Sequence, residues 1–135
     1  MAPVECELSK VVMSESHDRQ LVILQEKEGN RSLPIMIGLF EVFAIHRTVN
    51  NEPPPRPLTH ELLGSILETM GITIEKVIVN DLREKTFYAR LHLKQNGDTY
   101  DIDSRPSDGI ALAMQTGAPI FIEESVLERA GRESE

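Results

Sequence analysis

The chain has 135 residues, 40% of them hydrophobic, and a formal net charge of −8, which indicates one globular domain with an ordinary core. Because 14 basic residues stand against 22 acidic ones, tight and extended binding to duplex nucleic acid is not expected, since phosphate contacts supply most of that affinity. No apolar run of 18 residues and no basic region followed by an apolar stretch at the N-terminus is present, so we expect neither a membrane span nor a signal peptide.

The first part of the chain predicts three strands, at residues 4–13, 20–25 and 33–37, with a polar connection at 14–19. The single cysteine, Cys6, belongs to an alternating apolar run, so we expect it to be a small core residue rather than a nucleophile. A lone cysteine also excludes an internal disulfide and suits a reducing cytoplasm.

Gly29-Asn30 is a turn signal between the second and third strands, because both residues tolerate positive φ. A two-residue loop there predicts a hairpin with Leu24 opposite Ile35 and an apolar match along its length. A helix over residues 39–49 follows, with Phe40, Phe43 and Ala44 expected to face the core together.

Residues 50–57 contain four prolines in five positions, which forbids helix and central strand. This stretch is either a stiff spacer between helices or a lid or docking loop. The next helix, from about Thr59 to a stop at Gly71, has one apolar face. Its members are Leu62, Leu63, Ile66, Leu67 and Met70.

The second half predicts a strand at 72–79, a loop at 80–85 and a strand at 87–94, then a hairpin turn at Asn96-Gly97. A type I′ turn there pairs Leu93 with Tyr100 and Leu91 with Ile102 on a buried face. The same register puts His92 opposite Asp101 and Arg90 opposite Asp103. A helix from Pro106 to Gly117, a strand at 119–122 and a helix at about 124–130 complete the chain.

The candidate site is the corner between the strand at 100–103 and the helix that follows it. Asp103, Arg105, Ser107 and Asp108 gather there, with Asp108 in the first helical turn, where a negative charge suits the dipole. Asp101 and Asp103 are either ligands or a general-base pair, or they are cross-strand partners of His92 and Arg90 on a solvated face.

Residues 35–45 can be aligned with residues 102–112, since both stretches are predicted to form a strand, a turn and a helix in that order. This alignment places Glu41 on Asp108. One interpretation is a duplicated β-rich unit whose two helix N-termini approach each other, and the other is chance similarity. The fold class we predict is α+β: a single compact domain with a mixed, mostly antiparallel sheet from two strand–turn–helix units and helices packed on it, over residues 4–130, followed by a polar tail at 131–135.

Four segments in family order and spacing closely resemble the bifunctional nuclease (BFN) domain family. They are Leu33-Pro34-Ile35-Met36-Ile37-Gly38 with Glu41, Arg56-Pro57-Leu58-Thr59-His60-Glu61-Leu62-Leu63, Thr86-Phe87-Tyr88-Ala89, and Ile102-Asp103-Ser104-Arg105-Pro106-Ser107-Asp108 through Thr116-Gly117-Ala118-Pro119-Ile120. Met36 and Leu39-Phe40 depart from the residues usual in the family but leave Glu41 intact. The resemblance covers residues 4–130 and implies a single α+β domain with activity on DNA and RNA as transient substrates.

With that resemblance, the residues suggest metal-assisted phosphodiester hydrolysis. Glu41, Asp103 and Asp108 are candidate oxygen ligands for Mg²⁺ or Mn²⁺. Arg105 and Arg56 are candidates to hold a phosphate, assisted by backbone N–H groups near Ser107. His60 is a candidate general acid or base. We expect Asp103, Arg105, Asp108 and His60 to be the catalytic residues.

Each role has a structural alternative: Arg105 could pair only with a neighbouring aspartate, and His60 with Glu61 could be a solvated first helical turn. A second class of function also fits the acidic surface, the proline-rich loop and the strand edges. In that interpretation the chain is a non-enzymatic interaction module that self-associates or binds a protein partner. A homo-oligomer is expected in either case. A nucleotide-binding regulator is not supported, because no glycine-rich phosphate loop is present.

Overall fold

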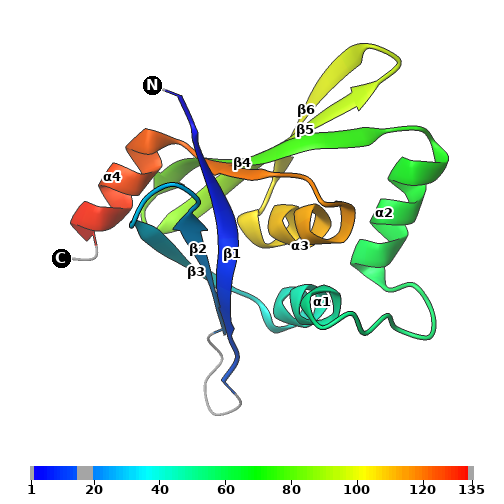
Figure 1. Cartoon of the computed structure of the whole chain (residues 1–135), viewed down its shortest axis with the longest axis horizontal. Coiled ribbons are helices and arrows are strands. Elements are labelled where there is room, and N and C mark those ends of the chain that lie inside the picture. Colours follow the sequence, from blue (N-terminus) through cyan, green and yellow to red (C-terminus); the bar gives the residue numbers. More distant parts are fainter. Residues whose placement is uncertain (1, 15–19, 134–135) are drawn as a thin grey trace.

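The computed structural model describes residues 2–14 and 20–133. Its strands form one seven-stranded sheet in the order β3-β2-β1-β7-β4-β5-β6, antiparallel except where β4 meets β7 (Figure 1). The strands are β1 (Val4–Val12), β2 (Gln20–Glu26), β3 (Ser32–Ile37), β4 (Thr73–Arg83), β5 (Thr86–Gln95), β6 (Asp98–Ser104) and β7 (Ile120–Ile122). The helices are α1 (Leu39–Val49), α2 (Thr59–Thr69), α3 (Pro106–Thr116) and α4 (Glu124–Glu133). The predicted α+β class is confirmed.

The sheet consists of two antiparallel three-stranded units joined by one short strand. Strands β1, β2 and β3 lead into α1, and strands β4, β5 and β6 lead into α3. Strand β7 lies between them, antiparallel to β1 and parallel to β4. The arrangement matches the repeated strand–turn–helix pattern that the sequence predicts, with the two units meeting across β7.

Helix α3 is the centre of the molecule and explains the position of the other helices. It packs on β4 and β5 and also contacts α1 and α2 (Figure 1). Ile110, Ala111, Leu112 and Ala113 are all buried, so this helix is apolar on most of its circumference. Gly109 allows it to approach the sheet, because a Cβ there would lie 2.8 Å from Val77 Cγ1.

The Asn96-Gly97 turn and its register are confirmed. Asn96 and Gly97 have φ of 51° and 86°, and Arg90 pairs with Asp103 and Leu91 with Ile102, as predicted. Cys6 is buried, also as predicted, and burial raises the pKa of its thiol to about 11. The predicted loop at 80–85 is wrong: β4 continues to Arg83, and the turn is only Glu84-Lys85, both at positive φ.

The predicted register of the β2–β3 hairpin is wrong by two residues. Leu24 pairs with Leu33 and Val22 with Ile35, because the connection is longer than a two-residue loop: the Glu26 N–H donates to the Arg31 carbonyl at 3.0 Å. The shift is even, so the same side chains still face the core.

Three apolar groups predicted to be buried are exposed instead. Phe40 is 83% exposed and Phe43 40%, because the buried side of α1 consists of Glu41, Val42, Ala44 and Ile45. On α2 the only buried residue is His60, so most of the predicted apolar face lies at the surface. Strand β6 pairs as predicted, but Tyr100 and Ile102 are exposed since no element covers that edge strand in the described residues.

The last helix, α4, continues to Glu133, so the first residues of the predicted polar tail are helical. It is tied to both halves of the sheet: Arg31 donates to both Glu124 oxygens, and Arg129 Nη2 donates to Asp81 Oδ1 at 2.9 Å. His17 and residues 15–19 of the predicted connection lie outside the described residues. None of the described helices is both long and apolar enough to cross a membrane.

The close approach of α3 to β4 gives a test of the packing. Gly109→Ala should destabilise the fold by about 1–3 kcal/mol through overpacking against Val77, although alanine is the better helix former. Gly131→Ala is the matched control, because it lies in α4 with nothing within 4 Å of a built Cβ and should stabilise by up to about 1 kcal/mol. Denaturant unfolding measures both. A Gly109→Ala protein as stable as Gly131→Ala would contradict the packing described.

Candidate functional site

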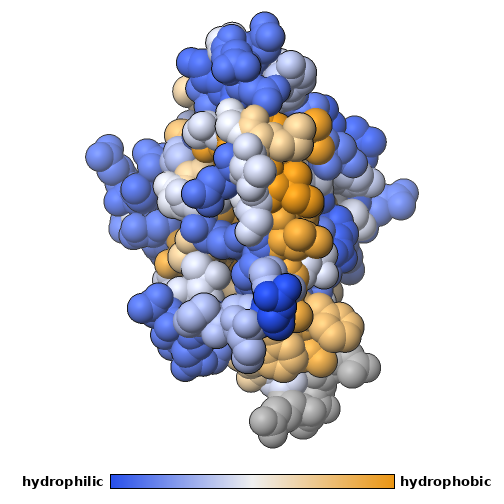
Figure 2. Space-filling view, turned by 90° about the vertical axis from the view of Figure 1, so that its right-hand side faces the viewer, coloured by the Kyte–Doolittle hydropathy of each residue, from blue (hydrophilic) through white to orange (hydrophobic). Residues whose placement is uncertain are grey.

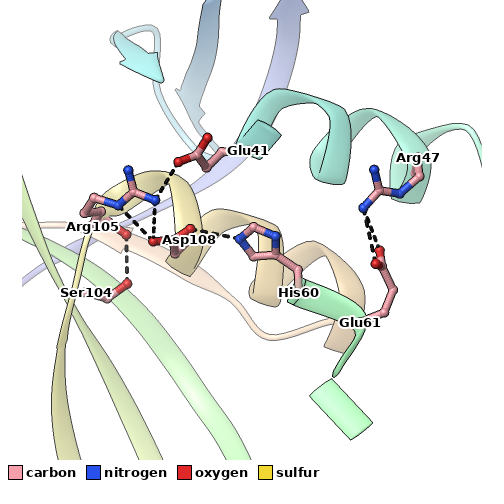
Figure 3. A network of polar contacts seen from close by, with 7 residues as sticks. All are labelled: Glu41, Arg47, His60, Glu61, Ser104, Arg105 and Asp108. Carbon is pink, nitrogen blue, oxygen red and sulfur yellow. Dashed lines mark hydrogen bonds and ion pairs between the residues drawn. The ribbon is translucent and has the colours of Figure 1, made fainter. Parts of the chain in front are cut away.

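Four polar side chains from three helices meet near the start of α3 (Figure 3). Arg105 Nη2 donates to Glu41 Oε1 at 2.5 Å and lies 2.9 Å from Asp108 Oδ2, while Arg105 Nε donates to the same Asp108 oxygen at 3.0 Å. His60 Nε2 lies 2.8 Å from Asp108 Oδ1. The chain Glu41–Arg105–Asp108–His60, called the polar cluster below, therefore links α1, α3 and α2.

The start of α3 fixes two members of the polar cluster. Arg105 is the N-cap residue with an extended backbone, and Pro106 occupies the first helical position, where a missing N–H costs nothing. Asp108 then falls in the first turn, three residues after Arg105, which brings the two side chains to the same side of the helix.

Glu41 is placed by the start of α1, in its first turn. Gly38 precedes this helix, and a Cβ at Gly38 would lie 2.5 Å from Glu41 Oε2. The glycine therefore leaves the space that the buried carboxylate occupies. The Glu41 side chain is only 10% exposed, and its charge is compensated by the guanidinium of Arg105.

His60 is placed by contacts of α2 with α1. Arg47 Nη2 donates to both oxygens of Glu61, at 3.2 and 3.1 Å (Figure 3). Glu61 also accepts the backbone N–H of Leu58 at 3.1 Å, which holds the first turn of α2. The predicted alternative for this turn, a solvated His60 and Glu61, does not describe it, because His60 is buried and Glu61 is paired.

The polar cluster carries two carboxylates and one guanidinium. Hydrogen bonding to Glu41, and then to Asp108, raises the pKa of Arg105 further above its ordinary value. Arg105 is therefore a permanent cation that reduces the repulsion between the two carboxylates. Its side chain remains 65% exposed, and the contacts of the described residues use only Nε and Nη2. Nη1 is left for a ligand.

A cavity of about 490 Å³ opens beside Arg105, lined also by Pro106 and Ser107 from α3 and by Gly38 before α1. Strand β3 and residues 85–87 form the remaining walls. Lys85 is the second cation of this cavity. Lys85 was not among the predicted site residues, because only the folded arrangement brings β3 beside residues 85–87.

Three predicted site residues are not part of the polar cluster. Asp103 is 76% exposed on β6 and lies 3.8 Å from Arg90, whose Nε donates to Asp101 at 2.9 Å. These contacts agree with the cross-strand alternative for the two aspartates. Arg56 is exposed in the loop before α2, and Ser107 is buried at the cavity wall.

The predicted metal ligands Glu41, Asp103 and Asp108 do not converge on one point. Across residues 2–14 and 20–133, no group of three histidine, cysteine, aspartate or glutamate side chains is arranged to hold a metal ion. Arg105 lies between Glu41 and Asp108, where a cation shared by the two carboxylates would bind. The side chains as arranged therefore do not fit the predicted Mg²⁺ or Mn²⁺ set.

Comparison with known proteins identifies the family to which the chain belongs. The family model for the bifunctional nuclease domain matches residues 22–135. An uncharacterized protein of Mycobacterium tuberculosis is 39% identical over 119 residues, which cover 88% of this chain and 71% of that protein. The chain belongs to the bifunctional nuclease domain family.

Plant proteins named as bifunctional nucleases are more distant. Bifunctional nuclease 1 of Oryza sativa subsp. indica is 24% identical over 123 residues, 88% of this chain and 37% of the rice protein. Bifunctional nuclease 2 of Arabidopsis thaliana is 26% identical over 105 residues, 75% of this chain and 32% of that protein. The matched region is thus about a third of each plant protein.

The Glu41–Arg105 pair gives a test of the polar cluster that does not depend on activity. A double-mutant cycle with Glu41→Gln and Arg105→Met should give a coupling free energy of about 1–3 kcal/mol, because Arg105→Met leaves the Glu41 carboxylate poorly solvated and without its cation. Arg90→Met with Asp101→Asn is the matched control, an exposed pair expected to couple by about 0.2–1 kcal/mol. Equal coupling in the two cycles would contradict the buried pairing of Glu41.

Proposed function

We propose that this chain hydrolyses phosphodiester bonds in DNA and RNA, with Arg105 as the residue that binds the scissile phosphate. The proposal rests on how the guanidinium of Arg105 is held in place and how far it is exposed. Its guanidinium is fixed by two carboxylates, yet it is mostly exposed at a cavity wall and has Nη1 available. A planar, permanently charged donor that is already oriented is suited to bind a phosphate and to stabilise charge that builds up on it.

The walls of the cavity add to its preference for an anion. Lys85 supplies a second positive charge, and α1 and α3 both begin at the cavity, at Gly38 and at Pro106. The N-terminal ends of helices carry a partial positive charge and unpaired N–H groups. A phosphate bound beside Arg105 would therefore meet two cationic side chains and two helix ends, although the chain as a whole has a net charge of −8.

Proton transfer is assigned to Asp108. Its side chain is 30% exposed and is held from both sides, by Arg105 and by His60. In hydrolysis a water attacks phosphorus, the bond from phosphorus to the leaving oxygen breaks, and the attacking water gives up a proton. Asp108 accepts that proton, and the leaving oxygen takes up a proton from solvent water. His60, which is buried behind it, is a positioning residue that orients the carboxylate.

The relatives support the class of reaction, since rice and Arabidopsis proteins of this family are named bifunctional nucleases. The net acidity of the chain favours a transient encounter with nucleic acid over stable binding. The proposed substrates are therefore short single-stranded DNA and RNA, which reach a cavity of this size more readily than a duplex.

The first test compares purified variants on labelled single-stranded DNA and RNA. Arg105→Met and Lys85→Met should each lower kcat/KM by about 10²-fold or more, and Asp108→Asn by about 10²–10⁴-fold. Arg83→Met is the matched control, because Arg83 is an exposed cation on the same strand pair that contacts Asp81 and lies outside the cavity. Cleavage that persists in Arg105→Met and Asp108→Asn would show that another site or a contaminant is responsible.

The second test asks whether the protein binds Mg²⁺ or Mn²⁺, the cofactors expected from the sequence. The proposed mechanism assigns no residues to hold either metal. If a cation binds the native protein at 100 times its dissociation constant, it should stabilise the fold by about 2.7 kcal/mol. Thermal melting with each metal and with a chelator measures this, and the cleavage assay is repeated under the same conditions. We expect little change in melting temperature without substrate, because Arg105 already occupies the place between Glu41 and Asp108 where a shared cation would bind. A large shift that Asp108→Asn abolishes would contradict that expectation.

A further inference from the structure

One face of the molecule carries an apolar strip, which Figure 2 shows running down the side formed by α2. The name apolar surface is given to exposed side chains from three neighbouring elements: two from α1, those of α2 and the residues that flank it, and two from the edge strand β6. They are Phe40, Phe43, Leu58, Leu62, Leu63, Ile66, Met70, Tyr100 and Ile102.

Hydrogen bonds of side chains and backbone join these elements into one region. Arg47, one turn beyond Phe43 on α1, reaches Glu61 on α2. At the other end of α2, the Met70 carbonyl accepts a hydrogen bond from Gln95 Nε2, beside the turn between β5 and β6. The apolar surface therefore extends from α1 along α2 to the β5–β6 hairpin.

The exposed apolar residues of α2 follow the periodicity of a helix. Leu62, Ile66 and Met70 are spaced by four residues, and Leu63 adjoins them, so they form one continuous side of the helix. A surface helix normally turns such a side to the core, whereas α2 buries only His60. The sequence thus encodes an apolar face that this chain does not cover within its described residues.

The size of the apolar surface matches what a stable dimer needs. Because a large apolar or aromatic side chain presents about 150–250 Å², nine of them at about half exposure present on the order of 900 Å². A standard interface covers about 800 Å² on each partner. Isolated exposed apolar residues are ordinary, but a contiguous region of this size marks an interaction site.

We propose that the apolar surface is the contact between two copies of this chain, related by a two-fold axis. Two-fold homodimers are the commonest soluble assemblies, and in them one self-complementary patch covers itself. The stripe of α2 packs against the same stripe of the second copy. The chain is acidic overall, and Glu68 and Asp98 lie on the same elements as the apolar surface, which disfavours nucleic acid or an anionic membrane as the occupant.

The proposal is independent of the catalytic one, because the residues of the apolar surface are not members of the polar cluster. It also gives a location to the homo-oligomer that the sequence led us to expect. Since Phe40 and Leu58 are neighbours of Glu41 and His60 in sequence, the dimer contact borders the candidate site without including it.

Light scattering coupled to size exclusion tests the dimer on the full chain. The wild type should show twice the monomer mass of 15.2 kDa. Leu62→Glu and Ile66→Glu should halve the mass, because each would place a carboxylate in the apolar contact. Both side chains are about half exposed in the monomer, so circular dichroism should show that the variants remain folded.

Val49→Glu is the matched control and should remain a dimer, since Val49 is also about half exposed on α1 but, nine residues after Phe40, lies on the opposite side of that helix. A wild type that is monomeric at all concentrations, or Ile66→Glu and Leu62→Glu proteins that keep the dimer mass, would overturn the proposal. Sedimentation of a monomeric wild type with phosphatidylcholine vesicles, lost in Ile66→Glu, would assign the surface to lipid instead and would also overturn it.

Discussion

The contact of Arg105 with Glu41 and Asp108 is the interaction on which the arrangement of the helices depends. Glu41 belongs to the first structural unit, and Arg105 and Asp108 to the second. A buried carboxylate is costly unless a cation compensates it, so α1 can pack against α3 only with Arg105 in place. The same contact immobilises the guanidinium. One residue therefore closes the fold and presents a fixed positive charge to solvent.

The local features of this chain are predictable from its sequence, because they depend on short-range chemistry. Asn96-Gly97 specifies a tight turn and, with it, the register of β5 and β6. The alignment of the two strand–turn–helix stretches identified Glu41 and Asp108 as counterparts, and the structure joins them through Arg105. Gly29-Asn30 also resembles a tight-turn signal, but the connection between β2 and β3 is longer than two residues, which is why their register was wrong by two residues.

Solvent exposure was harder to predict than secondary structure. Periodicity shows which side of α2 is apolar, but it does not show whether the same chain covers that side. Phe40 and Ile102 were misplaced for the same reason: both belong to apolar patterns that the monomer leaves exposed. Lys85 was missed for a different reason, since its role depends only on where β3 lies relative to the start of β5, a long-range arrangement with no local signature.

Strand β7 has three residues, yet among the described strands it alone joins the two halves of the sheet. It pairs residues 4–6 of β1 with residues 120–122, the largest sequence separation of any strand pair in the molecule. Closing so long a loop is slow, because its entropy is lost before the contacts form. During synthesis one edge of the first strand must therefore stay unpaired until residues 120–122 have left the ribosome.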